Sequence, residues 1–279
     1  MPEINETSLQ ALRALRSTDP LLSSTFPTSK EETNTTSPGY SQHVQFDNDG
    51  NITTLNLGGR RLRKLPNITE VFASLKQLTT LNLGSSDLAP PLLVNILKSV
   101  PSLVHFHLSG NGLRDNGIQL LSPCIAQLQT LDLRYNDITS IGLGHLGEAL
   151  ESKNTLHILH LEGNMVKDDG ISTLTSSLLS SPYNYIKELY LGSNQIEAGG
   201  AQSLSKLISA NKSLQKLHLE GNNIGPNGAE ALATVLEEMG HEERVLEKLY
   251  VDNNNMGKEV AQRLAKALNS DSTIVESMF

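Results

Sequence analysis

Apolar residues recur along the chain in one spaced pattern. Eleven-residue segments carry an apolar residue at the first, fourth, sixth and eleventh positions, with mostly polar or small residues between them. Apolar residues at alternate positions predict a short strand with one buried face. Eight such segments occur, 25 to 32 residues apart, and they begin at Ile52, Leu78, Leu103, Leu128, Leu156, Ile186, Leu214 and Leu246.

The stretches between these segments predict helices. In residues 227–239, apolar side chains recur at helical spacing at Ala229, Leu232, Ala233 and Leu236. A repeated strand-and-helix unit is typical of a solenoid, in which each unit buries its apolar face against its neighbours. A helix is thicker than a strand, so stacked units are expected to curve, with strands inside and helices outside.

A second pattern narrows the type of repeat. The form N-x-[IL]-x-x-x-G-[AI]-x-x-L occurs as NGLRDNGIQLL, NQIEAGGAQSL and NNIGPNGAEAL, at residues 111–121, 194–204 and 222–232. In these letters the chain resembles the leucine-rich repeat family, in the ribonuclease-inhibitor class that Ran GTPase-activating proteins and the repeat domains of NOD-like receptors share. The resemblance implies an α/β leucine-rich repeat solenoid, or horseshoe, with a parallel concave sheet, convex helices and about eight repeats plus caps.

Asparagine occupies the ninth position of the last six segments. An amide side chain both donates and accepts hydrogen bonds, so it can satisfy backbone groups of the turn and of the next coil. The first two segments carry Arg60 and Ser86 there, which predicts a weaker ladder at that end. The expected structural ladder consists of Asn111, Asn136, Asn164, Asn194, Asn222 and Asn254.

The two ends differ from the repeats. Residues 1–41 are expected to be a mostly disordered tail, with a short amphipathic helix at ETSLQALRALR capped by Thr7 or Ser8. That helix is either a partner-docking motif or a segment folded onto its own chain. Residues 42–279 are the predicted repeat domain, with a capping hairpin at 42–51, repeats at 52–271 and a C-terminal cap at 272–279.

Residues between the buried leucines face away from the core and line the concave surface. The first two copies present small neutral side chains there, whereas the later copies present His, Tyr and acidic residues. Tyrosine offers contact area at low entropy cost, which suits a binding surface. The alternative is that these positions are solvated and varied. The predicted partner-binding residues are His107, Asp132, Arg134, His160, Glu162, Glu188, Tyr190, His218, Glu220, Tyr250 and Asp252.

Charge and composition limit the kind of partner. The net charge of −8 argues against a nucleic-acid or anionic-membrane ligand and mildly favours a protein partner with a basic surface. The single cysteine, Cys124, permits no intramolecular disulfide and suits a reducing compartment. No signal peptide and no apolar stretch of membrane-spanning length is found. We therefore expect a cytoplasmic chain, with the nucleus also open, that is a monomer by itself.

No motif predicts a catalytic, cofactor or metal site. His107, Asp132 and His160 fall in one column, but with strands about 4.8 Å apart the two histidines lie too far apart to share a metal. The DNDG sequence at residues 47–50 suggests a calcium loop, yet the glutamate that such a loop needs is replaced by Gly58. We expect no enzyme activity, no cofactor and no metal.

Three functions follow from these observations. The leading hypothesis is a non-enzymatic protein–protein interaction module that binds a protein on its concave face, in a scaffold or regulatory role. The resemblance also suggests a Ran-type GTPase-activating protein, in which Arg134 would stabilise phosphate charge. A substrate-receptor subunit of a larger complex, docked through the N-terminal tail, is the third.

Overall fold

The computed structural model describes residues 4–17, 22, 26, 43–60, 62, 67–152, 154–243 and 245–268, of which residues 240–243 are described by backbone only. The chain forms two compact units. The first unit comprises Met1–Asn111 with Gln127–Leu131, and the second comprises Gly112–Ala126 with Asp132–Phe279. The expected disorder of the tail, apart from residues 17, 22 and 26, and the expected C-terminal cap fall outside the described residues.

The strands follow one another in the sheet in chain order. The first pair, β1 with β2, is antiparallel, whereas the pairs from β2 to β4 and from β6 to β9 are parallel. This confirms the predicted α/β solenoid with a mainly parallel sheet. In the described part of the chain the strands are β1 Val44–Phe46, β2 Ile52–Asn56, β3 Thr80–Asn82, β4 His105–His107, β5 Thr130–Asp132, β6 Ile158–His160, β7 Glu188–Tyr190, β8 Lys216–His218 and β9 Lys248–Tyr250.

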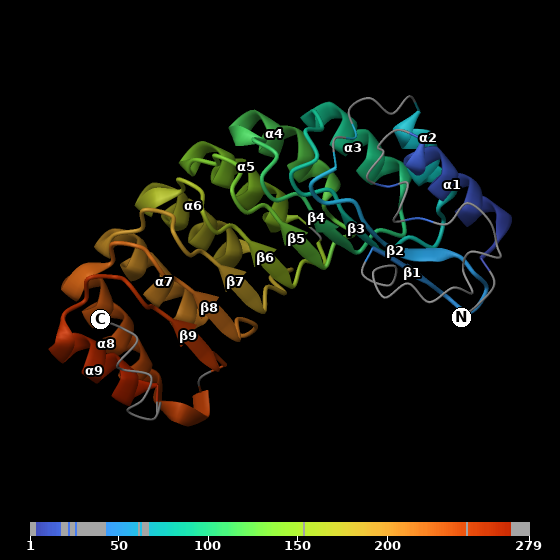
Figure 1. Ribbon diagram of the computed structural model, residues 1–279. Helices are drawn as coiled ribbons and strands as arrows, with labels where there is room; N and C mark the ends of the chain where they lie inside the picture. Colours follow the sequence, from blue (N-terminus) through green and yellow to red (C-terminus); the bar gives the residue numbers. More distant parts are fainter. Residues whose placement is uncertain are drawn as a thin grey trace. The chain divides into compact units, whose positions relative to one another are not determined.

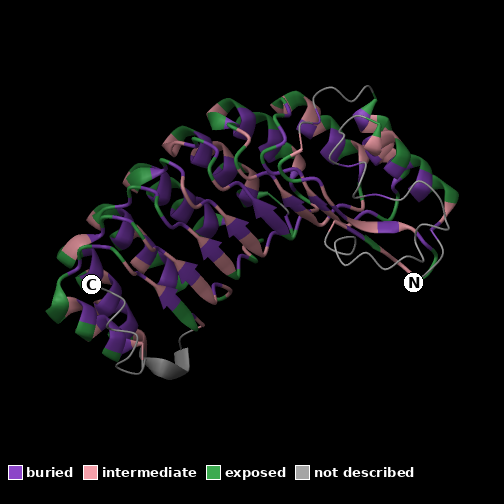
Figure 2. Cartoon of the chain, viewed as in Figure 1, coloured by how far each residue is buried: buried purple, intermediate pink, exposed green. Residues whose placement is uncertain are grey.

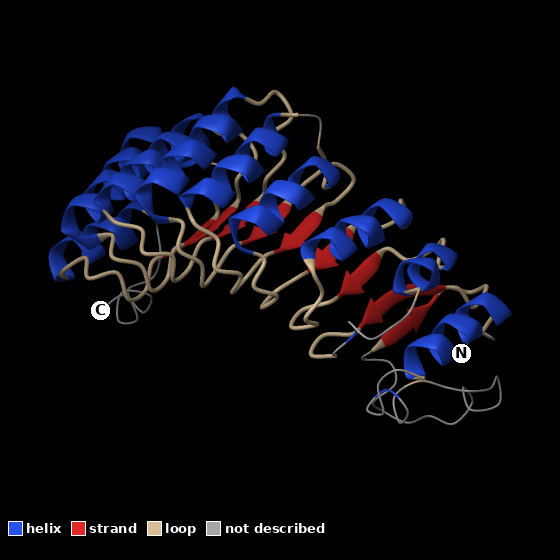
Figure 3. Cartoon of the chain, turned by 90° about the horizontal axis from the view of Figure 1, so that it is seen from above, coloured by secondary structure: helices blue, strands red, loops and turns tan. Residues whose placement is uncertain are grey.

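Helices cover one side of the strands within each unit (Figure 3). In the second unit, α6 to α9 lie side by side in chain order (Figure 1). The described helices are α1 Glu6–Arg16, α2 Ile68–Ser74, α3 Pro90–Ser99, α4 Arg114–Leu121, the short 3-10 helix η4 Ser122–Cys124, α5 Ser140–Glu151, α6 Lys167–Ser180, α7 Ala198–Ala210, α8 Gly225–Glu243 and α9 Lys258–Ala267.

The core lies between the strands and the helices (Figure 2). Burial alternates along β3, β4 and β6 to β8, whereas all three residues of β5 are buried. In β7, Leu189 is fully buried, whereas Glu188 and Tyr190 on either side of it are half-buried. Each buried leucine contributes about 1.5–3 kcal/mol relative to an exposed one. The alternation therefore fixes which side chains face the helices and which face the opposite side of the sheet.

Helix α1 packs onto the hairpin of the first unit. Leu9, Leu12 and Leu15 form its buried side. The expected cap at Thr7 or Ser8 was wrong, because the Asn5 side chain caps the helix by accepting from the Ser8 backbone N–H at 2.9 Å. The Ser8 hydroxyl instead accepts from the backbone N–H of Ile52 at 3.1 Å, which joins the helix to β2.

The ninth-position asparagines link consecutive repeats. Asn222 Nδ2 donates to the carbonyls of Leu191 and Leu219 at 2.9 and 2.8 Å, and its Oδ1 accepts from the backbone of Asn194 and Ile196. The bonds between repeats run to the preceding coil, whereas the sequence suggested the next one. Bonds to the preceding coil are also made by Asn111, Asn136, Asn164, Asn194 and Asn254.

Ser86 replaces this asparagine in the first unit. Its hydroxyl makes only long contacts, 3.5 Å to the carbonyl of Leu57 and 3.4 Å to that of Gly84. A hydroxyl is shorter than an amide and carries one donor, so it cannot reach the set of backbone groups that Asn222 joins.

Candidate functional site

The strands of the second unit present one face that its helices do not cover. We call the outward-facing side chains of β6 to β9 and of the residues just after each strand the open face. His160, Tyr190, His218 and Tyr250 lie in register on adjacent strands. This confirms the column that the strand pattern predicts, because residues in register on parallel strands point the same way.

The four rings of this column form a continuous stack, which we call the ring stack. Ring centroids lie 4.1 Å apart from His160 to Tyr190, 4.2 Å from Tyr190 to His218 and 4.1 Å from His218 to Tyr250. The planes are inclined by 23°, 20° and 17°. These separations are shorter than the strand spacing of about 4.8 Å, so the rings lean together and stabilise one another.

A glutamate accompanies each histidine of the stack. His160 Nδ1 lies 3.3 Å from Glu162 Oε1, and His218 Nδ1 lies 2.9 Å from Glu220 Oε1. In each pair the two residues are two positions apart, so they share the open face. Each carboxylate thereby fixes the orientation of its imidazole within the stack.

Glu188 is held by two neighbours. It accepts from the Tyr190 hydroxyl at 2.7 Å and from Lys216 Nζ on β8 at 2.7 Å. Burial alone would raise the pKa of Glu188, but hydrogen bonds from Lys216 and Tyr190 outweigh it and hold the pKa below its ordinary value. Burial and the hydrogen bond to Glu188 raise the pKa of the Tyr190 hydroxyl well above its ordinary value. Tyr190 is thus a neutral donor over the physiological range.

Asp132 and Arg134 form a separate two-pronged ion pair in the second unit. Arg134 Nε donates to Asp132 Oδ1 at 2.9 Å and Nη2 donates to Oδ2 at 2.7 Å. Asp132 is almost fully buried, and the hydrogen bonds that Arg134 donates to its carboxylate raise the pKa of the Arg134 guanidinium. Because the guanidinium already neutralises a buried carboxylate, it is poorly placed to stabilise a transferring phosphate.

The remaining predicted site residues stand apart from the ring stack. His107 belongs to β4 of the first unit, in register with Asn82. Asp252 follows β9, and its backbone carbonyl accepts from the N–H of Gly221 at 2.8 Å. The structure therefore groups seven predicted residues together: His160, Glu162, Glu188, Tyr190, His218, Glu220 and Tyr250.

The sequence pattern missed exposed side chains at both edges of the strands in the second unit. Tyr135 is 65% exposed and Met165 is 38% exposed, and both belong to turns that follow strands. Tyr183 and Tyr185 are exposed in the segment that precedes β7. Their signal in the sequence is the presence of large apolar side chains in turns, where the repeat does not require them.

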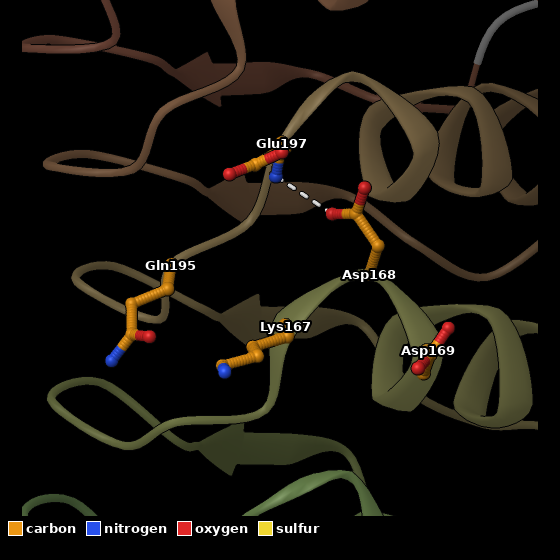
Figure 4. A pocket seen from close by; sticks show the side chains of 5 residues that line it. All are labelled: Lys167, Asp168, Asp169, Gln195 and Glu197. Carbon is orange, nitrogen blue, oxygen red and sulfur yellow. Dashed lines mark hydrogen bonds between the residues drawn. The ribbon is translucent and has the colours of Figure 1, made fainter.

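A shallow hollow of about 320 Å³ lies beside α6 and α7, lined by Lys167, Asp168, Asp169, Gln195 and Glu197. Asp168 Oδ1 accepts from the backbone N–H of Glu197 at 2.7 Å, at the start of α7 (Figure 4). Asp115 binds Thr139 and Gly142 at the start of α5 in the same way. The carboxylates of Asp115 and Asp168 therefore serve as caps for the next helix, since an N-terminal turn has unpaired N–H groups.

Two features are absent from the residues that the structure describes. None of their helices combines the length and the apolar character needed to cross a membrane. No group of three or more His, Cys, Asp and Glu side chains among them is arranged to hold a metal ion.

Comparison with known families identifies the repeats. The family profile for the leucine-rich repeat matches five segments, at residues 101–122, 127–147, 152–174, 184–205 and 210–233. These matches coincide with the strand–turn–helix units from β4 to α8.

Similar proteins share the repeats over part of their length. The pig ribonuclease inhibitor is 37% identical over 177 residues, which is 61% of this chain and 38% of that protein. The human NACHT, LRR and PYD domains-containing protein 13 is 32% identical over 198 residues, which is 67% of this chain and 19% of that protein. The chain thus spans less than two fifths of either relative.

Among solved structures, the actin-binding site 2 of leiomodin-1 is 20% identical, with a TM-score of 0.37, and the match covers 46% of this chain and 70% of that one. This likeness is too weak to support a comparison. The profile matches, the curated relatives and the observed strand–helix units agree: the chain is a leucine-rich repeat protein of the ribonuclease-inhibitor-like type.

Proposed function

We propose that this chain is a non-enzymatic protein-binding module and that its open face contacts a folded protein partner. The observation that carries the proposal is the ring stack. Its rings are half-buried and stacked, and three of them, His160, Tyr190 and His218, contact carboxylates, so little conformational entropy remains to be lost on binding.

The relatives support a protein ligand. Leucine-rich repeats generally mediate protein–protein interaction, and the name of the pig relative designates an inhibitor of ribonuclease, which is itself a protein. Tyrosine is enriched at protein interfaces because it offers apolar area together with a polar tip. A scaffold or regulatory role fits a module with such a surface.

The test compares partner capture by two variants with matched changes. The open-face variant combines Tyr250→Ala with Lys248→Glu, which removes the last ring of the stack and reverses one exposed charge. The control combines Leu179→Ala with Lys206→Glu on the exposed side of α6 and α7. Both variants remove one large side chain and change the net charge equally.

Tagged wild type and both variants are cross-linked in native extracts, and the bound proteins are identified by mass spectrometry. We expect the control to retain the wild-type partner and the open-face variant to lose it by about tenfold or more, which corresponds to about 1.4 kcal/mol. Equal capture of the partner by all three proteins would show that the open face is not the binding surface. Loss in the control alone would move the contact to the helices.

A further inference from the structure

Strands β6 and β8 carry the same five residues on either side of β7. His-Leu-Glu-Gly-Asn occurs at residues 160–164 and again at 218–222. Between them, β7 places Tyr190 in the ring stack and Gly192 two residues later. The open face therefore has a local symmetry about β7, with a histidine–glutamate pair on each flank.

The side chains of both glutamates border this glycine. A Cβ at Gly192 would lie 3.7 Å from Glu162 Cγ and 3.7 Å from Glu220 Oε2. Gly192 itself is buried beneath these neighbours. Since glycine has no side chain, the space between these two glutamate side chains, which come from either side of β7, is left unfilled.

These carboxylates are incompletely paired. One carboxylate oxygen of each glutamate contacts the neighbouring histidine, Glu162 with His160 and Glu220 with His218. Glu162 Oε2 is buried without a hydrogen-bond partner. Among the described residues, no lysine or arginine lies within ion-pair distance of either glutamate. Arg134 acts electrostatically on Glu162, but its guanidinium is hydrogen-bonded to Asp132, so a further cation near both glutamates would lower their mutual repulsion.

We propose that Glu162 and Glu220 receive the guanidinium group of an arginine presented by the partner protein. This inference rests on the proposed function and adds the chemistry of the contact. The arginine lies over Gly192, beside the ring stack, and donates to the free oxygen of each carboxylate. Because Glu162 Oε2 is buried, the Glu162 side chain moves about its inner torsions to present this oxygen to the arginine.

The geometry favours a guanidinium over the other cations. Strands β6 and β8 are separated by β7, so their backbones lie roughly 9–10 Å apart, twice the ordinary strand spacing. A calcium or magnesium ion requires oxygens within about 2.6 Å on several sides. A guanidinium is planar, carries five N–H donors in a fork, and can span two acceptors. An ammonium is a compact charge and would serve one carboxylate at a time.

A peptide titration tests this site without a known partner. Acetyl-Gly-Arg-Gly-amide is added to the isotope-labelled full chain, and the amide signals of Glu162, Gly192 and Glu220 are followed by NMR. The matched peptides carry citrulline, which has the same shape without the charge, or lysine. We expect saturable shifts with arginine, binding weakened by about tenfold or more with citrulline, and a smaller loss with lysine.

The Glu162→Gln/Glu220→Gln variant provides the control protein. We expect it to lose the arginine response while the ring signals of His218 and Tyr250 remain dispersed. Equal binding of the citrulline peptide, or an unchanged response in this variant, would overturn the proposal. Shifts of the same signals with calcium or magnesium chloride alone, but not with the peptide, would also overturn it. Partner capture by the Tyr250→Ala/Lys248→Glu protein is independent of these results, so the two proposals can fail separately.

A second experiment introduces the cation by a substitution in the chain itself. Gly192→Arg puts a guanidinium between the carboxylates, and Gly192→Met adds a side chain of similar length without charge. A Cβ at this position lies 3.2 Å from the carbonyl of Glu220, so both variants share the same steric cost. We expect a higher Tm for the arginine variant, and a difference that vanishes in the Glu162→Gln/Glu220→Gln background. Equal Tm values would contradict the proposed pairing.

Discussion

Strands of the two units use the same position, the one between the paired leucines, in different ways. In β2 and β3 of the first unit it holds Asn56 and Asn82, whose side chains accept from the backbone N–H groups of Gly58 and Gly84 at 3.1 and 2.8 Å. In β6 to β9 of the second unit it holds the ring stack. The side chains of Asn56 and Asn82 bend back to the turns that follow their own strands, whereas the rings face outward and contact one another.

This difference shows that the repeat and the surface are separable properties. The buried leucines and the pairing of parallel strands recur in both units, because they are required for stacking. The side chain between two buried leucines is not needed for stacking, so it can form an Asx-type turn or an aromatic contact without changing the fold. A few residues per repeat therefore determine the chemistry of the surface.

Removal of a ladder asparagine should have the largest effect. Asn222→Ala leaves the buried N–H groups of Asn194 and Ile196 without their acceptor, a loss of about 4 kcal/mol in the free energy of unfolding. The carbonyls of Leu191 and Leu219 each keep a second donor, from Asn194 and Asn254. Ser86→Ala in the first unit should cost less than about 1 kcal/mol, because its bonds are long. Urea denaturation measures both, and equal losses would show that the ladder is uniform.

Loss of the central ring should come next. Tyr190→Ala removes two ring contacts and the hydrogen bond to Glu188, and should cost about 3 kcal/mol. Tyr190→Phe keeps the rings and should cost about 1 kcal/mol. Asn82→Ala, at the matched position of the first unit, should cost about 1 kcal/mol or less, since only one local bond is lost. If Tyr190→Ala cost no more than Asn82→Ala, the stack would be a contact of no energetic importance.

Two turn glycines give a smaller contrast. Gly163 of the second unit has φ +68° and Gly59 of the first has φ +74°, where a side chain costs about 1 kcal/mol. A Cβ at Gly163 would also collide with the Tyr135 ring, whereas a Cβ at Gly59 would have no neighbouring atom within 4 Å. We expect Gly163→Ala to lower the Tm more than Gly59→Ala, and Tyr135→Ala to remove the excess. If Gly163→Ala still lowered the Tm by the same extra amount in the Tyr135→Ala background, the extra loss would come from backbone strain.

The acid response should show the smallest effect. The pKa of Glu188 is lower in the folded chain, so its stabilisation is present above the ordinary carboxyl pKa of about 4.3 and is lost as the pH falls through the lowered value. The Tm difference between wild type and Glu188→Gln should be positive at pH 7 and close to zero near pH 3. Exposed pairs of this kind are worth about 1 kcal/mol or less.

Asp47 is the matched carboxylate of the first unit. Hydrogen bonds from Asn51 lower its pKa, so Asp47→Asn should reduce the acid sensitivity of that unit in the same direction. Thermal scans of both variants between pH 3 and pH 7 provide the measurement. An opposite sign in either would mean that the carboxylate is not stabilised in the folded chain.

The strand register and the buried positions were predictable from the sequence. The spacing of leucines places His160, Tyr190, His218 and Tyr250 in one column, as the pairing of β6 to β9 confirms. Alternation along a strand determines facing directly, since successive side chains point to opposite sides. No knowledge of rotamers is needed for that inference.

The contacts within the column were not predictable. The strand pattern treats the open-face residues as separate solvated side chains, whereas the rings lean together and each histidine binds a glutamate. These contacts depend on side-chain torsions, which sequence spacing does not specify. The cap at Asn5 and the capping roles of Asp115 and Asp168 were missed because each depends on loop geometry.

The ring stack also gives the chain an optical signature. The sequence contains six tyrosines and no tryptophan, so its near-ultraviolet circular dichroism and intrinsic emission come mainly from tyrosine. Tyr190 and Tyr250 are held between or against imidazole rings, whereas Tyr135, Tyr183 and Tyr185 are exposed. The two stacked tyrosines should contribute strongly to the spectrum, so the arrangement of the face can be followed in solution without any added dye.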